Sequence, residues 1–264
     1  MIERTRRMLY GRRKGPKLSA HQQHLFDRLL PQFALRPTPG ADPRTYFSSP
    51  LEDMWLEVGF GGGEHLVWQA QHHPEAGLIG AEPYVNGVVK LLSKIDSLSP
   101  SGGEGRGEGD QKREIRNQNG SATEPHPSPL RQSGRGSSVS NIRIYMGDAR
   151  DILEALPDAS LGRVFVLFPD PWPKTRHHKR RFLQMETLDQ LARVLKPGAE
   201  LRFASDDSGY VEWTLERFMA HAAFEWIATR ATDWETRPAD WPPTRYEAKE
   251  LHGKPVFLKF GRRW

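Results

Sequence analysis

The chain has 264 residues, a formal net charge of +5 and no cysteine. This length suits one large α/β domain, and the positive charge is typical of proteins that bind a polyanion. The lack of cysteine excludes disulfides and thiolate zinc sites, and no stretch approaches the roughly 18 apolar residues of a membrane span. We therefore expect a cytoplasmic protein with no membrane partner.

Residues 1–35 predict a basic arm followed by a short helix. Seven cations lie between Arg4 and Lys17, against the single acid Glu3. This composition is typical of flexible arms that contact phosphates, but a solvated tail without function has the same composition. A helix is expected over His21–Leu35. Residues 36–264 are expected to form the folded domain.

Residues 54–82 show the pattern of a strand, a glycine turn, a helix and a second strand. Met54–Val58 and Gly77–Glu82 predict the strands, and Glu64–His73 the helix between them. A nucleotide-like cofactor binds at such a turn in a doubly wound sheet. The cofactor-binding candidates in the turn are Gly59, Gly61 and Gly63.

Acidic residues near the turn distinguish between classes of cofactor. Glu57 ends the first strand, and Glu64 occupies a position where the dinucleotide fingerprint requires glycine or alanine. Two carboxylates there would repel a pyrophosphate, which disfavours NAD and a nicotinamide oxidoreductase. S-adenosylmethionine carries a sulfonium and an ammonium but no phosphate. Glu82 lies 23 positions after Gly59, near the spacing of about 20 expected for a ribose-binding acid.

The next helix, over Pro83–Ile95, is followed by an abrupt change in composition. Residues 96–140 are rich in Ser, Gly, Pro, Glu and Arg and poor in large apolar side chains, which predicts a disordered insert within the domain. A strand over Asn141–Met146 and a helix over Ala149–Leu156 then resume the pattern. Asp148 between them either accepts from the amino group of a bound adenine or caps the helix.

The stretch FPDPWPKTRHHKRR, residues 168–181, follows a predicted buried strand over Val164–Phe168. Its alternating prolines restrict the backbone, so Asp170 and Trp172 are expected in a defined, extended loop at the carboxyl edge of the sheet. The cations that follow suit phosphate binding, although a solvated basic helix start has the same pattern. Trp172 either stacks on a base or packs under the loop. His177 and His178 lack a third ligand at suitable spacing, so we expect no metal.

The remaining elements complete a seven-stranded, doubly wound, mostly parallel sheet of the Rossmann-like α/β class. Helices are expected over Phe182–Leu195, where Lys196–Gly198 ends the helix, and over Tyr210–Ala222. Strands are expected over Glu200–Ala204, Phe224–Thr229 and Val256–Phe260. The polar and aromatic loop at 234–252 is long enough to indicate a function.

Five motifs together resemble one family. They read LEVGFGGGEHL, IGAEPYVNGVV, FPDPWPKTRHHKRR, SDDSGY and TRYEAK. This combination resembles the bacterial tRNA (guanine-N7)-methyltransferases, the TrmB family, over nearly the whole chain except the insert and the first residues. The resemblance implies a class I S-adenosylmethionine-dependent methyltransferase that modifies N7 of guanine 46 in the tRNA variable loop. A monomer is expected rather than a homodimer.

The resemblance also implies roles for individual residues. Those that match the cofactor-binding acids are Glu57, Glu82, Asp148 and Asp170, and Asp170 also matches the catalytic acid. Those that match tRNA-substrate positions are Lys174, Asp206, Thr244, Arg245, Tyr246 and Glu247. Further candidates for phosphate contacts are Arg176, Lys179, Arg180, Arg181, Arg12 and Arg13. Ser205 stands where the family usually has threonine, which keeps a hydroxyl.

One alternative belongs to a different functional class. A catalytically inactive RNA-binding protein with a methyltransferase-like fold would keep the basic residues while losing the cofactor turn. The glycine turn and its acids are intact in this sequence, which argues against that alternative.

Overall fold

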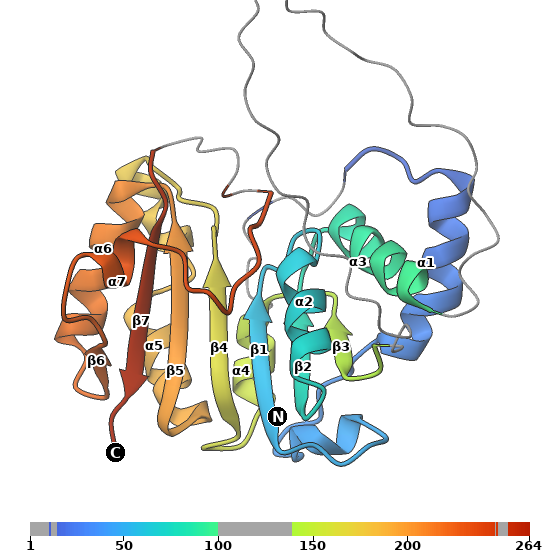
Figure 1. The fold of residues 1–264 in the computed structure, drawn as a ribbon, viewed down its shortest axis with the longest axis horizontal. Helices are drawn as coiled ribbons and strands as arrows, with labels where there is room; N and C mark the ends of the chain where they lie inside the picture. Colours follow the sequence, from blue (N-terminus) through green and yellow to red (C-terminus); the bar gives the residue numbers. More distant parts are fainter. Residues whose placement is uncertain (1–10, 12–14, 100–138, 246, 248–252) are drawn as a thin grey trace, which may run out of the picture.

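The computed structural model describes residue 11 and residues 15–99, 139–245, 247 and 253–264. Helices cover both faces of one seven-stranded sheet (Figure 1). The strands are β1 (Asp53–Val58), β2 (Ala76–Ala81), β3 (Ile142–Tyr145), β4 (Leu161–Leu167), β5 (Leu195–Ser205), β6 (Phe224–Trp226) and β7 (Val256–Arg262). The α-helices are α1 (Ala20–Phe33), α2 (Glu64–His72), α3 (Val85–Leu98), α4 (Ala149–Ala155), α5 (Met185–Val194), α6 (Ser208–Ala220) and α7 (Thr232–Glu235). The 3₁₀ helices are η1 (Pro43–Tyr46) and η2 (Thr175–Arg180).

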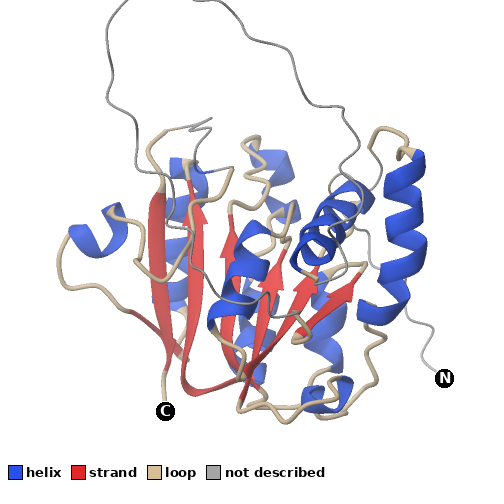
Figure 2. Ribbon diagram, turned by 45° about the vertical axis from the view of Figure 1, so that its right-hand side comes forward, coloured by secondary structure: helices blue, strands red, loops and turns tan. Residues whose placement is uncertain are grey.

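The strand order is β3-β2-β1-β4-β5-β7-β6. The strands from β3 to β5 are parallel, and β7 runs antiparallel to both β5 and β6. This confirms the predicted doubly wound, mostly parallel sheet of the Rossmann-like α/β class. Strand order reverses between β1 and β4, so a crevice opens beyond the carboxyl ends of these two strands. Figure 2 shows the loops that crowd this edge of the sheet.

Alternate residues of the strands supply two separate hydrophobic layers. Met54 and Leu56 of β1 point to the face covered by α4, α5 and α6, whereas Trp55 points to the face covered by α1, α2 and α3. Burial on both faces explains why the parallel strands read as nearly continuous apolar runs. No helix among the described residues has both the length and the apolar composition to cross a membrane.

Helix α1 packs against the rest of the domain. The boundary predicted at residue 35, between the N-terminal segment and the folded domain, therefore does not interrupt the hydrophobic core. Leu25 and Leu29 are buried in the layer that also holds α3. The N–H of Leu35 donates to the carbonyl of Ile144 at 2.7 Å, which adds a bridge at the β3 edge. Most of the predicted basic arm, including Arg12 and Arg13, lies outside the described residues.

The borders of the predicted insert also differ from those in the structure. Helix α3 continues past Ile95 to Leu98, and Val139 is buried in the layer that holds α3. Residues 96–99, 139 and 140 therefore belong to the described fold, because Leu98 and Val139 pack against the core. The bulk of the predicted insert, residues 100–138, lies outside the described residues.

The predicted break between α5 and β5 was wrong. Helix α5 ends at Val194 and β5 begins at the next residue, so Lys196–Gly198 lies within the strand. Leu195 pairs with Leu161 of β4, and Lys196 Nζ lies 2.6 Å from Asp53 Oδ1. Pairing with the neighbouring strand therefore outweighs the local turn signal of the Lys-Pro-Gly sequence.

Asn141 joins the start of β3 to the segment between α2 and β2. Its side chain is buried, and Nδ2 donates to the carbonyls of Ala70 and His73 at 3.1 Å and of Ala76 at 2.9 Å. One amide group thus satisfies carbonyls at the end of α2 and the beginning of β2. A side chain without donors cannot replace it.

We expect Asn141→Asp to destabilise the protein more than Asn141→Ala. The alanine variant leaves buried carbonyls without this donor and should lose about 1–3 kcal/mol of unfolding free energy. The aspartate variant adds a carboxylate that faces those same oxygens. Urea unfolding at neutral pH measures both losses. An aspartate variant at least as stable as the alanine variant would contradict this account of Asn141.

Candidate active site

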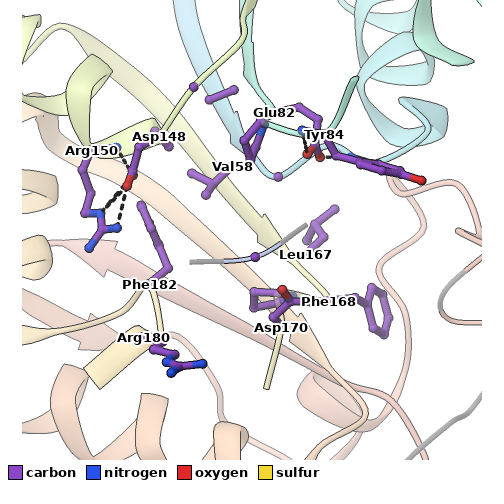
Figure 3. Close-up of a pocket in the computed structure, with 18 of the residues that line it drawn as sticks. Val58, Glu82, Tyr84, Asp148, Arg150, Leu167, Phe168, Asp170, Arg180 and Phe182 are labelled. Carbon is purple, nitrogen blue, oxygen red and sulfur yellow. Dashed lines mark hydrogen bonds and ion pairs between the residues drawn. The ribbon is translucent and has the colours of Figure 1, made fainter. Parts of the chain in front are cut away.

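A cavity of about 630 Å³ lies at the point where strand order reverses. Its walls come from the carboxyl ends of β1, β2 and β4, the loop after β3 and the loop after β4 (Figure 3). The lining residues include Val58, Gly59, Gly61, Glu82, Tyr84, Asp148, Arg150, Phe168, Asp170, Trp172, Arg180 and Phe182. The cavity thus has the size and the position of a small-molecule site in an open α/β sheet.

Glu82 fills the anion-binding side of the glycine turn. Its Oε2 accepts from the N–H of Gly61 and its Oε1 from the N–H of Tyr84, both at 2.8 Å. Burial raises the pKa of Glu82 above its ordinary value, while the two backbone hydrogen bonds lower it. In a dinucleotide site, backbone N–H groups of the turn are free to face a pyrophosphate. Here the Gly61 N–H already donates to the Glu82 carboxylate, which favours a ligand without phosphate.

Glu57 and Glu64 are placed differently from the sequence interpretation. Glu57 is buried, and its Oε2 lies 2.8 Å from His65 Nδ1, while Glu64 pairs with Lys94 at 3.4 Å. Neither side chain lines the cavity. The exclusion of pyrophosphate therefore depends on Glu82 instead, and a contact between Glu57 and a cofactor remains a prediction.

The glycines of the turn serve two purposes. Gly59 and Gly61 line the cavity with φ angles of 69° and 56°, and Gly63 caps α2 with a φ of 75°. Such left-handed conformations favour glycine, because a side chain would crowd the backbone. A Cβ on Gly63 would also lie 2.6 Å from Leu91 Cδ1. Gly63 therefore holds α2 close to α3 and does not face the cavity.

Asp148 caps α4 and pairs with a cation. Its Oδ1 accepts from the N–H of Arg150 at 3.0 Å and from Arg150 Nε at 2.9 Å. The capping role considered from the sequence is thus confirmed. Both residues also line the cavity, so the Asp148 carboxylate remains within reach of a bound ligand (Figure 3). Arg150 was missed from the sequence because nothing local distinguishes it from other helical arginines.

The loop after β4 presents Asp170 to the cavity. Phe168 and Trp172 have φ angles of 48° and 46°, so two non-glycine residues in the left-handed region bracket the acid. The extended conformation predicted for Trp172 was therefore wrong. Asp170 is exposed and lies across the cavity from Glu82, whose pKa its charge helps to raise (Figure 3). The expected juxtaposition of Asp170 with the glycine turn is therefore present.

The basic residues after this loop fall into two groups. Lys174, Arg176 and Lys179 are exposed around η2, while Arg180 lines the cavity with its guanidinium carbon 4.9 Å from the centre of the Trp172 ring. Arg181 is buried and donates to two backbone carbonyls. Arg180 and Arg181 are thus adjacent in sequence, but Arg180 lines the cavity and Arg181 is buried in the protein.

Of the remaining predicted substrate residues, those that the structure describes do not line this cavity. Asp206 follows β5 and lines a separate hollow with α6. The backbone N–H of Thr244 donates to the Glu247 carboxylate, and the backbone N–H of Glu247 donates to the Thr244 hydroxyl. Arg245 is half-buried in the same segment, and Tyr246 lies outside the described residues. Near this segment, Asp240 accepts from Arg202 at 2.6 Å and Gln69 donates to its carbonyl at 2.9 Å. This anchor was not predicted, because it joins three distant parts of the chain.

Gly87 of α3 is a further residue that the sequence analysis missed. A Cβ at this position would lie 2.5 Å from the carbonyl oxygen of Gly61. The glycine therefore lets α3 approach the backbone of the turn. The available signal was its place in a helix, where glycine is unfavourable unless packing requires it.

The chain is similar to known proteins in sequence and in fold. The family model described as "Putative methyltransferase" matches residues 52–258. A tRNA (guanine-N(7)-)-methyltransferase of Rhodospirillum rubrum is 47% identical and aligns with 96% of this chain and 87% of its own. A protein of the same name from Brucella abortus is 41% identical over 96% and 94% of the two chains. The solved structure of the 16S rRNA methyltransferase KamB has a TM-score of 0.52 at 15% identity and covers 87% of this chain and 100% of its own, which is a likeness of fold.

We expect Gly87→Ala to destabilise the protein by about 1–3 kcal/mol, because the added methyl group meets a backbone oxygen that cannot move without shifting the turn. Alanine in a helix otherwise gains up to about 1 kcal/mol. Gly209→Ala in α6 is the matched control, since its Cβ would meet only atoms at 3.5 Å or beyond. Thermal unfolding compares the two variants. A Gly87→Ala variant as stable as the control would contradict the close approach.

Proposed function

We propose, given that the chain belongs to the bacterial tRNA (guanine-N7)-methyltransferase family, that it transfers a methyl group from S-adenosylmethionine to N7 of guanine 46 in the tRNA variable loop. The observation that carries the proposal is the placement of Asp170 and Glu82 across one cavity at the reversal of strand order. The family and the fold support a methyltransferase. S-adenosylmethionine as the methyl donor, guanine 46 as the modified nucleotide and the roles of individual residues are our proposal.

The residues of the cavity fit S-adenosylmethionine. When bound, this cofactor supplies an electrophilic methyl group on a sulfonium. Glu82 offers carboxylate oxygens to the ribose hydroxyls from its fixed position beside Gly61. Asp148, already oriented by Arg150, can accept from the adenine amino group. The excess of carboxylates over cations suits a ligand that carries positive charge and no phosphate.

Asp170 acts on the guanine by position and charge. Guanine N7 has an exposed lone pair, so no side chain needs to remove a proton before it attacks. Positive charge develops on the imidazole ring of guanine during transfer, and a carboxylate held by a rigid loop stabilises that charge without rearranging. The same carboxylate can accept from guanine N1–H and the N2 amino group, which selects guanine over adenine.

The tRNA contacts are proposed from exposure and charge. Lys174, Arg176 and Lys179 extend from η2 beside the cavity and can reach phosphates. We assign Asp206, Thr244, Arg245, Tyr246 and Glu247 to contacts with the nucleotides that flank the guanine.

The reaction can be tested by mapping the methylated nucleotide. Unmodified tRNA is incubated with the protein and labelled S-adenosylmethionine, and the label is located by nuclease digestion and mass spectrometry. We expect 7-methylguanine at position 46. Label at another base or position would contradict the proposed specificity, and no label in any tRNA would favour the inactive RNA-binding alternative.

We expect Asp170→Asn to keep the fold and to lose methyl transfer by about 100-fold or more, because the amide cannot supply the negative charge. Turnover at saturating tRNA and cofactor measures the loss. Asp158→Asn is the matched control, since Asp158 is exposed and pairs with Arg193 away from the cavity. Asp170→Asn turnover equal to that of the control would remove Asp170 from the catalytic role.

A further inference from the structure

Arg181 differs from the other cations that follow the proline-rich loop. Arg181 is only 2% exposed, whereas Arg176 and Lys179 are exposed on the surface. The guanidinium carbon lies 4.9 Å from the centre of the Tyr210 ring and 5.0 Å from that of Trp213. A guanidinium between two rings of α6 has little surface left for an incoming phosphate.

The donors of Arg181 are directed at the protein backbone. Nε donates to the carbonyl of Pro171 at 2.8 Å, and Nη1 donates to the carbonyl of Gly209 at 3.1 Å. One guanidinium therefore fastens the loop that carries Asp170 to the first turn of α6. A lysine could not make both bonds in this geometry, because it lacks the planar fork of donors.

The loop that Arg181 holds has a strained backbone. The Pro171 carbonyl belongs to the peptide unit that enters Trp172, whose φ is 46°. Non-glycine residues in this region cost of order 1 kcal/mol or more and persist only where the surrounding structure enforces the conformation. At the other end, the N–H of Phe168, whose φ is 48°, donates to the carbonyl of Ala204 at 2.7 Å. Both ends of the Asp170 loop are thus fixed by hydrogen bonds.

We infer that Arg181 is a positioning residue that sets the orientation of Asp170, in place of the phosphate contact expected from the sequence. The inference rests on the proposed function, because it assigns to Asp170 the role described above. Loss of the Pro171 bond lets the strained peptide relax and moves the acid relative to the cavity. Small displacements of a catalytic group lower turnover without weakening the binding of substrate.

The test compares Arg181→Lys and Arg181→Gln with Arg176→Gln in the full-length protein. Each variant is assayed for turnover at saturating unmodified tRNA and S-adenosylmethionine, with turnover normalised to the folded fraction. The affinity for tRNA is measured between about 50 and 200 mM salt, because each phosphate contact adds about 0.7–0.9 to the slope of log affinity against log salt. Arg181→Lys keeps the positive charge and the packed aliphatic part of the side chain but removes the planar guanidinium with its paired donors.

We expect turnover of Arg181→Lys to fall about 10- to 100-fold, since the acid is misplaced. Both Arg181 variants should keep the wild-type salt slope, whereas Arg176→Gln should lower it. Wild-type turnover in Arg181→Lys would overturn the positioning role, and so would an Arg181→Gln variant whose salt slope falls like that of Arg176→Gln. If Arg181→Gln does not unfold cooperatively, Arg181→Lys decides alone. Lack of methyl transfer in the wild type would instead contradict the proposed function.

Discussion

The hydrogen bond from the Gly61 N–H to Glu82 makes the cavity less favourable for a ligand that carries phosphate. A backbone donor that would attract a phosphate in a dinucleotide site is satisfied within the protein. The same bond joins the end of β2 to the turn after β1, so the turn is fixed before any ligand binds. Gly87 allows α3 to close against that turn, because no side chain separates it from the Gly61 carbonyl. The choice of ligand and the local packing therefore both involve the backbone of Gly61.

The opposite wall of the cavity is built on a different principle. Three prolines, two left-handed residues and the Arg181 guanidinium leave the loop around Asp170 few alternative conformations. Rigidity matters here because electrostatic stabilisation is effective only when the charged group does not have to reorient during the reaction. The structure thus places a preorganised acid opposite a preorganised turn. In this arrangement, strain in the backbone is balanced by hydrogen bonds to β5 and α6.

Much of the fold followed from local patterns in the sequence. Apolar periodicity predicted the seven strands and most of the helices, because burial on one or both faces leaves a clear repeat along the chain. The glycine turn and the proline-rich loop were identified for a different reason, because glycine and proline mark turns and rigid loops. Errors arose at element ends, as at Lys196–Gly198, where pairing with β4 outweighed the turn signal.

The sequence by itself thus determined the fold class, the glycine turn and the loop that carries Asp170, because each depends on residues close together in the chain. Only the tertiary structure decided which acid occupies the turn, since Glu57, Glu64 and Glu82 differ in their distant partners. It also separated Arg180 from Arg181, which are adjacent in sequence but lie in the cavity and beneath the loop, respectively. Burial and partner choice arise from packing between remote segments, and no local pattern encodes them.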